Sequence, residues 1–359
     1  MARLLSFPLA LITFLLSFIF PNFSPKVDQT DWNTNYSYVF VHGLMGWGSY
    51  DIQYDLMPYW GMFNGELLSK LDDKGYNCYA ASVAPTSSAW DRACELYAQL
   101  TGTVVDYGKA HSEACGHDRY GTDYTGRALI KKWDSENKIN LLGHSFGGAT
   151  IRVFASMMAI GSAEEIAATD ENDISPFFTG GKADWIYSLT ALAAPHNGTS
   201  AYSESSSDID SAAYDMFIDN AYVLNETIHT SELTYYFSIP CSATVKNADG
   251  TYSADTHLME SMFQSSANEM GKNMWTTPAG HVIDETWLEN DGLVNTISAK
   301  APSSAPSKEF NENEAVVPGV WHIMPTYNGD HMSLQGGLLK TNTDVERLYT
   351  EHLEMINCL

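Results

Sequence analysis

The segment Gly143-His144-Ser145-Phe146-Gly147 constrains the fold of this chain more than any other feature. It follows the short apolar run 138–142 and precedes residues 149–160, where apolar side chains recur at helical spacing. A serine flanked by glycines at such a junction matches G-x-S-x-G, in which a sharp turn between a strand and a helix exposes the hydroxyl. The segment therefore predicts a strand, a tight turn and a helix, with Ser145 at the turn.

Three further runs of apolar, aromatic and β-branched residues read as strands, at 36–41, 185–192 and 234–239. The first ends at a His-Gly loop and the second at the turn-forming segment 194–198. Buried strands that alternate with helical stretches predict an α/β fold, with a mostly parallel sheet and helices on both faces. A length of 359 residues suits one such domain, since α/β domains of this size often share a single core.

The first residues of the chain predict export. Residues 4–20 are almost wholly apolar, follow Arg3, and are succeeded by Pro21 and Asn22. This pattern is typical of a secretory signal peptide, so residues 1–24 are predicted to be the leader and 25–359 a secreted, extracellular domain. Because no A-x-A-like cleavage site follows, an uncleaved signal anchor is the alternative, although a spanning helix normally needs about 20 apolar residues.

The charge balance excludes one class of partner. The chain has 44 acidic and 19 basic residues, a formal net charge of −25, and would repel nucleic acid and anionic membranes. A nucleic-acid partner is therefore not expected, and no feature of the sequence implies a stable protein partner. Its five cysteines would meet an oxidising environment after export, which predicts one or two disulfides of unknown pairing.

A serine hydroxyl needs an imidazole to accept its proton and a carboxylate to orient that imidazole. Asp291 stands at a polar turn before an apolar run, in a loop that we expect beside a strand. The base could be His331, in a turn-rich loop near the end of the chain, or one of three rivals. These rivals are His281, His322 and His352. The residues alone leave this choice open.

The negative charge that develops on a substrate oxygen would need backbone N–H donors. One is expected from Phe146, next to the serine, and another from the glycine-rich loop 42–46 after the first strand. We assign the second donor to Leu44.

Five segments together resemble the secreted triacylglycerol lipases of thermophilic bacilli and their staphylococcal relatives. They are VFVHGLMGWG (39–48), SSAWDRACELYAQLTGTVVDYGKAHSEACGH (87–117), LLGHSFGGAT (141–150), APHNGTS (194–200) and WLENDGLVN (287–295). The resemblance implies the α/β-hydrolase fold and hydrolysis of acylglycerol esters, with a lipid or ester as substrate and transient contact with a lipid interface. A protein that keeps this fold and binds lipid without turnover is the alternative outside catalysis.

Carried over residue by residue, the resemblance implies a catalytic triad. Ser145 would be the nucleophile, Asp291 the orienting acid and His331 the base, and the oxyanion donors would be Leu44 and Phe146. The rivals His281 and His322 have no catalytic counterpart in the family.

The same family has a structural zinc site, which the resemblance places in an insertion near residues 87–120. The matching ligands are Asp91, His111, His117 and Asp210. A closed set of four protein ligands is typical of structural rather than catalytic zinc. Cys115 lies between the two histidines and is either an additional ligand or a disulfide partner.

Two departures from the family affect substrate and cofactor. The family has a long helical lid before the zinc aspartate, whereas here only the polar segment Thr199–Asp210 is present. This predicts an open cleft, weak interfacial activation and, as an alternative function, an esterase or polyester hydrolase acting on soluble or polymeric esters. After His331, residues 332–335 replace the acidic calcium ligand of the bacillar lipases, so calcium is doubtful, with Asp330 left open as another ligand.

Overall fold

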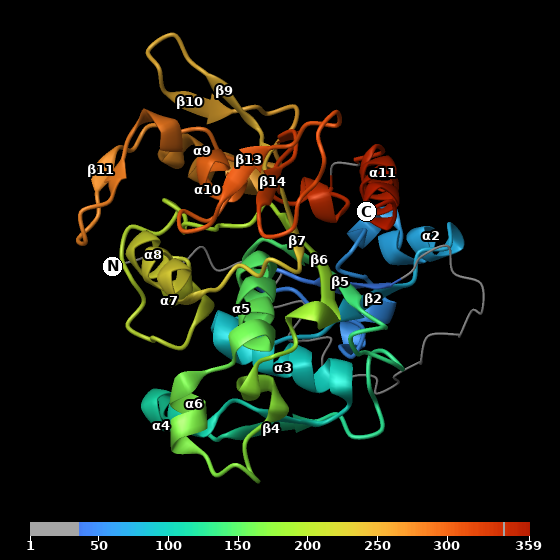
Figure 1. Ribbon diagram of the computed structural model, residues 1–359. Coiled ribbons are helices and arrows are strands. Elements are labelled where there is room, and N and C mark those ends of the chain that lie inside the picture. The colour runs from blue at the N-terminus through green and yellow to red at the C-terminus, as the bar shows by residue number, and fades with distance from the viewer. Residues whose placement is uncertain (1–35, 340–341) are drawn as a thin grey trace.

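A computed structural model describes residues 36–339 and 342–359 of the chain (Figure 1). At its centre is a seven-stranded sheet with the strand order β13-β14-β7-β6-β5-β1-β2, in which all neighbouring strands run parallel. The strands are β1 (Ser37–Val41), β2 (Cys78–Ala81), β5 (Ile139–His144), β6 (Ile186–Leu192), β7 (Tyr235–Ile239), β13 (Ser307–Glu309) and β14 (Trp321–Ile323). The predicted α/β class and parallel sheet are confirmed.

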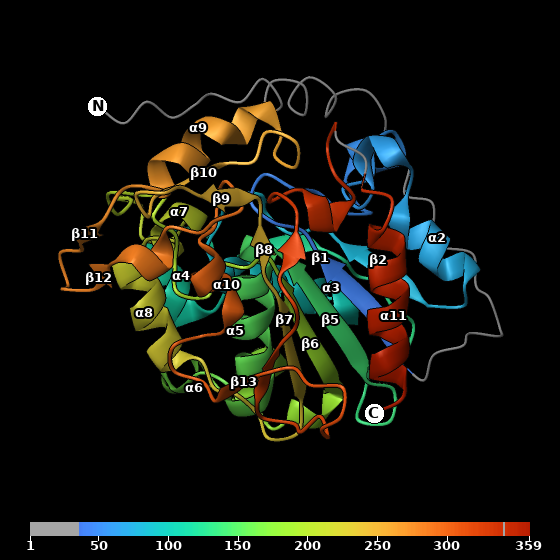
Figure 2. The same cartoon turned by 90° about the horizontal axis from the view of Figure 1, so that it is seen from above.

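Helices cover both faces of this sheet, as the sequence predicts. On one side lie α3 (Ala89–Thr101) and α5 (Phe146–Ile160), and on the other α2 (Leu67–Asp73) and α11 (Val345–Asn357) (Figures 1 and 2). Side chains of β1 alternate between the two apolar cores that result: Val39 and Val41 pack with α3 and α5, while Tyr38 and Phe40 pack with α2 and α11. The sheet therefore separates two cores that are both fully buried.

The other helices and strands lie around the central sheet and these four helices. Among residues 36–339 and 342–359, the other α-helices are α4 (Lys109–Cys115), α6 (Ala163–Ala168), α7 (Ala212–Asp215), α8 (Ile218–Thr227), α9 (Ser261–Met270) and α10 (Thr296–Lys300). Four small two-stranded sheets pair β3 (Val104–Asp106) with β4 (Tyr120–Asp123), β8 (Cys241–Ser242) with β15 (Tyr327–Asn328), β9 (Thr244–Lys246) with β10 (Tyr252–Ala254), and β11 (Trp275–Thr276) with β12 (Val282–Ile283). Short 3-10 turns occur at η1 (Ile52–Asp55), η2 (Met62–Asn64), η3 (Pro176–Thr179), η4 (Ala183–Trp185), η5 (Glu285–Trp287) and η6 (Ser333–Gln335).

One expectation is met and one needs correction. The loop of Asp291 lies beside a strand, since the N–H of Ala243, directly after β8, donates to the carbonyl of Asn290 at 3.1 Å. All five cysteines are free thiols, so the expected disulfides are wrong. Cys94 packs in the core under α3 and Cys241 in the opposite core, so the sheet itself keeps these two apart.

The predicted leader, residues 1–24, lies outside the described residues. Within the part of the chain that is described, no helix is both long enough and apolar enough to cross a membrane.

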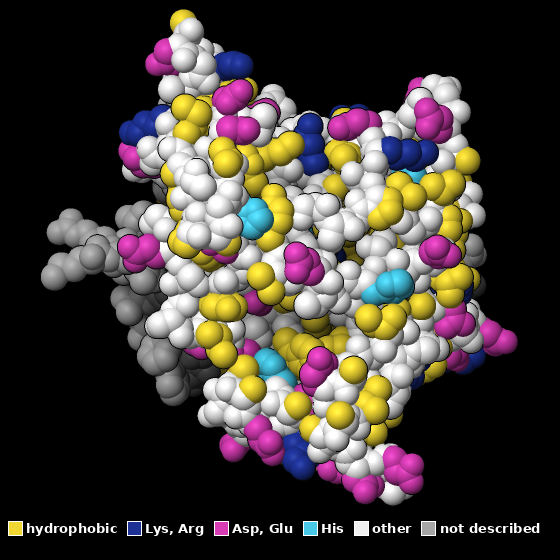
Figure 3. All heavy atoms as spheres, turned by 60° about the vertical axis from the view of Figure 1, so that its left-hand side comes forward, with side chains coloured by type: hydrophobic (Ala, Val, Ile, Leu, Met, Phe, Trp, Pro, Cys, Tyr) yellow, Lys and Arg dark blue, Asp and Glu magenta, His cyan; other side chains and the backbone are white. Residues whose placement is uncertain are grey.

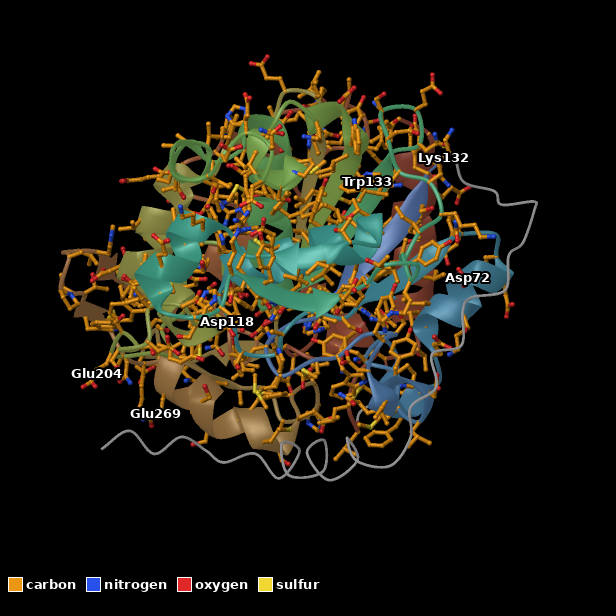
Figure 4. All side chains as sticks on the ribbon, turned by 90° about the horizontal axis from the view of Figure 1, so that it is seen from below. Asp72, Asp118, Lys132, Trp133, Glu204 and Glu269 are labelled. Atoms are coloured by element: carbon orange, nitrogen blue, oxygen red, sulfur yellow. The ribbon has the colours of Figure 1, made fainter. Side chains whose placement is uncertain are left out.

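The surface reflects the acidic composition. Figure 3 shows acidic side chains scattered over one face, among small and separate groups of apolar side chains. Glu204 and Glu269 extend from the periphery of the molecule in Figure 4, and both are exposed to solvent. Such a surface suits a protein that stays dispersed in water.

Candidate active site

Ser145 occupies a strained turn between β5 and α5. Its backbone has φ 55° and ψ −127°, a conformation that costs a non-glycine residue on the order of 1–3 kcal/mol. The flanking glycines make this turn possible: a Cβ on Gly147 would lie 2.4 Å from the carbonyl oxygen of Val41, and one on Gly143 would lie 2.4 Å from that of Gly147. The G-x-S-x-G pattern thus reflects close backbone contacts on both sides of the serine.

The structure brings together the three residues that the resemblance implies as a triad. His331 Nε2 lies 2.7 Å from Ser145 Oγ, and His331 Nδ1 lies 2.8 Å from Asp291 Oδ2. An ionised carboxylate only accepts, so Nδ1 carries the proton and Nε2 accepts from the serine hydroxyl. All three residues are buried, with 6%, 1% and 3% of Ser145, Asp291 and His331 exposed, which keeps these bonds from competition with water.

The Asp291 carboxylate is itself held in place. Its Oδ1 accepts the backbone N–H groups of Leu293 at 3.0 Å and Val294 at 2.7 Å, so Oδ2 is left to face the imidazole. The backbone N–H of His331 donates to the carbonyl of Asp291 at 2.9 Å. Side-chain and main-chain bonds therefore fix the acid and the imidazole relative to each other.

Two backbone N–H groups remain available beside the serine. Phe146 is the first residue of α5, and the first N–H groups of a helix have no intrahelical acceptor. Within the described ranges, neither the N–H of Phe146 nor that of Leu44 donates a hydrogen bond. The buried Arg92 guanidinium donates to the carbonyl of His42 at 2.5 Å, so a charged side chain braces the loop that carries Leu44. These donors suit a developing oxyanion.

The three rival histidines lie elsewhere. His281 stacks on a tyrosine ring with centroids 3.9 Å apart, and His322 stands on β14 with Nδ1 3.3 Å from a backbone carbonyl. His352 lies on α11, with Nε2 2.9 Å from the hydroxyl of Thr190. None of the three contacts Ser145.

Sequence reasoning did not single out Tyr59, His144 and Arg92, which surround this centre. Arg92 is adjacent to the predicted zinc ligand Asp91 but faces the other way, toward the loop after β1. His144 is the variable residue of G-x-S-x-G, and its place next to Ser145 is the feature of the sequence that could have pointed to it. Tyr59 lies far from the motif in the chain and carries no local signal.

The four predicted zinc ligands converge on one point. His111 Nε2 lies 3.1 Å from Asp91 Oδ1 and 3.3 Å from Asp210 Oδ1. His117 Nε2 lies 3.2 Å from Asp210 Oδ2 and 3.9 Å from Asp91 Oδ1. Residues from α3, from α4 and its following loop, and from the segment before α7 thus meet through two imidazole nitrogens and two carboxylates.

This donor set fits zinc. His117 Nδ1 lies 2.8 Å from the carbonyl oxygen of Asp118, labelled in Figure 4, so Nδ1 donates and Nε2 presents its lone pair inward. His117 Nε2 is a buried atom without a hydrogen bond. Burial alone would lower the pKa of His111, but hydrogen bonds and charge from Asp210 and Asp91 raise it to about 9. The two carboxylates therefore attract positive charge to this point.

Cys115 is a fifth donor at the same place. One potential ligand atom each from His111, Cys115, His117 and Asp210 lie within 4.8 Å of one another. Its Sγ is 3.9 Å from His111 Nδ1, on the side of the ring opposite to the nitrogen that faces the carboxylates. Cys115 therefore lies beside His111 and near the same point as His117 and Asp210.

The carboxylate of Asp330, left open above as a calcium ligand, accepts three hydrogen bonds. Its Oδ2 accepts the backbone N–H of Glu260 at 2.7 Å, and its Oδ1 accepts from the Met332 N–H at 3.1 Å and the Ser333 hydroxyl at 3.0 Å. Both oxygens are engaged by donors, so the carboxylate ties the loop of His331 to the start of α9.

An all-parallel sheet with a serine in a strained turn after a central strand, facing a histidine and an aspartate, defines an α/β-hydrolase. A family model described as "Lipase-like, C-terminal domain" matches residues 34–209. The crystal structure of Staphylococcus hyicus lipase is similar, with a TM-score of 0.82 at 28% identity over 93% of this chain and 99% of that one. EstA from Clostridium botulinum has a TM-score of 0.81 at 31% identity, over 94% of this chain and 92% of its own. The chain belongs to the family of staphylococcal-type lipases.

Curated relatives are longer. "Lipase 2" of Staphylococcus aureus is 31% identical in an alignment covering 87% of this chain but 52% of the relative. The chain therefore spans about half the length of the curated relatives it matches.

Proposed function

We propose that this protein hydrolyses carboxylic esters through an acyl-enzyme on Ser145. The observation that carries the proposal is the continuous hydrogen-bond chain from Ser145 Oγ to His331 at 2.7 Å and from His331 to Asp291 at 2.8 Å. Its membership of a family that contains lipases supports the same reaction.

In the proposed reaction, His331 Nε2 takes the hydroxyl proton as Ser145 Oγ attacks the ester carbonyl carbon. The N–H groups of Leu44 and Phe146 donate to the resulting oxyanion, and Asp291 stabilises the imidazolium. The tetrahedral intermediate expels the alkoxide, which takes the proton from His331 and leaves as the alcohol. Water then attacks the acyl group with His331 as base, and the carboxylic acid is released.

For substrate, we propose acylglycerols, in line with the names of the lipase relatives, and simple esters as the second candidate. The segment Thr199–Asp210 is irregular and mostly exposed, and forms no helix that could act as a long lid. This favours entry of dissolved esters without activation by an interface.

Rates on esters of increasing chain length, each measured below and above its solubility limit, test this substrate assignment. We expect the rate to follow saturation kinetics already with dissolved ester, below the solubility limit. The rate should not jump at that limit. A steep jump at that limit, with negligible hydrolysis of dissolved ester, would contradict the open-site proposal and indicate a lid-gated lipase.

We also propose a structural zinc ion held by Asp91, His111, His117 and Asp210. The set is closed, with no position left for substrate, and zinc would supply a cross-link between α3, the region of α4 and the segment before α7. Calcium is not part of this proposal, because residues 332–335 contain no acidic side chain.

For localisation, we propose an extracellular protein, on the basis of the apolar residues 4–20 at the start of the chain. Its proposed contacts are ester or lipid substrates and, transiently, a lipid surface. The net charge of −25 argues against nucleic acid.

A further inference from the structure

A hydrogen-bonded bridge runs behind the catalytic serine, from the loop of Leu44 to the backbone of His331. The N–H of Gly43 donates to the hydroxyl of Tyr59 at 3.1 Å. That hydroxyl lies 2.6 Å from His144 Nδ1, and His144 Nε2 lies 2.8 Å from the backbone carbonyl oxygen of His331. The bridge does not pass through Ser145.

The chemistry of its ends fixes the direction of every bond in the bridge. The His331 carbonyl only accepts, so Nε2 of His144 must carry a proton and donate it. A neutral imidazole then accepts at Nδ1, and the hydroxyl of Tyr59 is the donor there. Because the hydroxyl of Tyr59 donates its proton to His144, the oxygen can accept a hydrogen bond from the N–H of Gly43. Donors and acceptors match throughout.

The interior of the protein keeps this arrangement neutral and rigid. Tyr59 and His144 are 4% and 1% exposed, and the indole of Trp60 packs edge-on against both rings. Burial, and next the neighbouring charge on His331, lower the pKa of His144 to about 3. The ring of His144, whose centroid is 5.0 Å from that of His331, therefore does not compete for the proton that His331 receives in the proposed reaction.

The two ends of the bridge are the two parts of the machinery that must act together. Gly43 is bonded directly to Leu44, whose N–H is a proposed oxyanion donor, and the other end is the main chain of the base itself. A shift of either end would misplace a donor or the imidazole relative to the same substrate atom. Misplacement by about 1 Å can cost about 10²-fold in rate.

We propose that Tyr59 and His144 are positioning residues that hold the oxyanion loop and the catalytic histidine in register with each other. This inference rests on the proposed ester-hydrolase function. It gives His144, the variable residue before the serine in G-x-S-x-G, a positioning role.

Tyr59→Phe removes one hydroxyl from the bridge, and Tyr349→Phe is its matched control. Tyr349 is also buried, and its hydroxyl donates to the backbone carbonyl of Leu334 at 2.7 Å, which is not part of the bridge. For Tyr59→Phe we expect kcat to fall about 10- to 100-fold with KM changed less than about threefold, and labelling of Ser145 by a fluorophosphonate to slow in parallel. The control should keep kcat within about threefold of the parent.

His144 gives a second and independent arm. His144→Gln can keep a side-chain N–H donor toward the His331 carbonyl, whereas His144→Ala keeps none. The kcat of His144→Gln should therefore be at least about tenfold higher than that of His144→Ala. Losses in Tyr59→Phe and His144→Ala should also be less than additive, because either change breaks the same bridge.

The result that would overturn the inference is an active wild-type enzyme in which Tyr59→Phe and His144→Ala lose no more kcat than Tyr349→Phe. An equal loss in His144→Gln and His144→Ala would overturn it as well, since it would indicate packing rather than the hydrogen bond. If Tyr59→Phe fails to fold, the two His144 variants decide. An inactive wild-type protein would instead contradict the proposed function.

Discussion

His331 Nε2 lies 2.7 Å from Ser145 Oγ across a sequence separation of 186 residues. The serine is fixed by the turn after β5, and the histidine by a loop that follows β15 and is tied to Asp291 through both its ring and its backbone N–H. Neither loop alone defines the site. The contact exists because two separate segments are each held rigidly and meet over the end of one parallel sheet.

The turn at Ser145 should tolerate no side chain at Gly147. In Gly147→Ala, a Cβ 2.4 Å from the carbonyl oxygen of Val41 would force the backbone of β1 or α5 to move. We expect a fall in activity of about 10²-fold or more and a lower melting temperature, measured with a soluble ester and by thermal unfolding. Gly250→Ala is the control, since its Cβ would meet nothing within 4 Å and would carry only the strain of its φ of +90°. Equal behaviour of the two variants would contradict this account of the turn.

Removal of the proposed zinc ion should destabilise the fold. A strong chelator should lower the melting temperature of the parent protein by several degrees, because a metal that binds only the native state stabilises it. Asp210→Asn should reproduce the decrease and abolish the effect of the chelator. Glu204→Gln, an exposed change in the same segment, should keep the full response. A parent protein free of zinc and insensitive to chelation would refute the proposal.

The identity of the fourth ligand can be tested separately, since Asp91 and Cys115 compete for it. The Nε2 atom of His111 lies 3.1 Å from Asp91 Oδ1, whereas Cys115 Sγ lies 3.9 Å from the other ring nitrogen, Nδ1, so we expect Asp91 to bind the metal. The Co²⁺-loaded protein should then have no thiolate-to-cobalt charge-transfer band, and Asp91→Asn should weaken metal binding by about tenfold or more, whereas Cys115→Ser should not. A charge-transfer band that disappears in Cys115→Ser would reverse this assignment.

Glu95 should make the native state less stable as the pH rises from acidic to neutral. Burial raises the pKa of its carboxyl from 4.5 to about 7, although it accepts hydrogen bonds from the Ala84 N–H and the Tyr107 hydroxyl. The native state therefore favours the protonated acid, and stability on the order of 1–3 kcal/mol is lost as the pH rises from about 4.5 to 7.

Glu95→Gln stays neutral at every pH, so its melting temperature should fall less between pH 5 and pH 8 than that of the parent. An exposed substitution, Glu136→Gln, should leave the pH dependence unchanged. Parallel melting curves for parent and Glu95→Gln across this range would show that Glu95 is not the responsible group.

Local pattern was enough to predict part of this structure. The four strands read from apolar runs, β1, β5, β6 and β7, are present within one or two residues of their predicted bounds, because a strand buried on both faces needs a continuous apolar run. The edge strand β13 (Ser307–Glu309) was not predicted, since three polar residues at the margin of a sheet carry no such signal.

The site residues also divide into those that the local sequence predicts and those that it does not. Ser145 could be predicted from its own neighbours, because close backbone contacts demand the flanking glycines. The choice of His331 over three rival histidines came only from the resemblance, since its position depends on a loop held by distant segments. Tyr59 could not have been found, because its role exists only through contacts with Gly43 and His144 in the folded chain.

The most direct test of the central claim is ester hydrolysis by the purified protein and its Ser145→Ala variant, together with the site of fluorophosphonate labelling. We expect the parent to hydrolyse a short-chain ester and to be labelled at Ser145 alone, and the variant to lose at least about 10³-fold in rate and all labelling. Hydrolysis by Ser145→Ala at the rate of the parent, or labelling at a different serine, would contradict it.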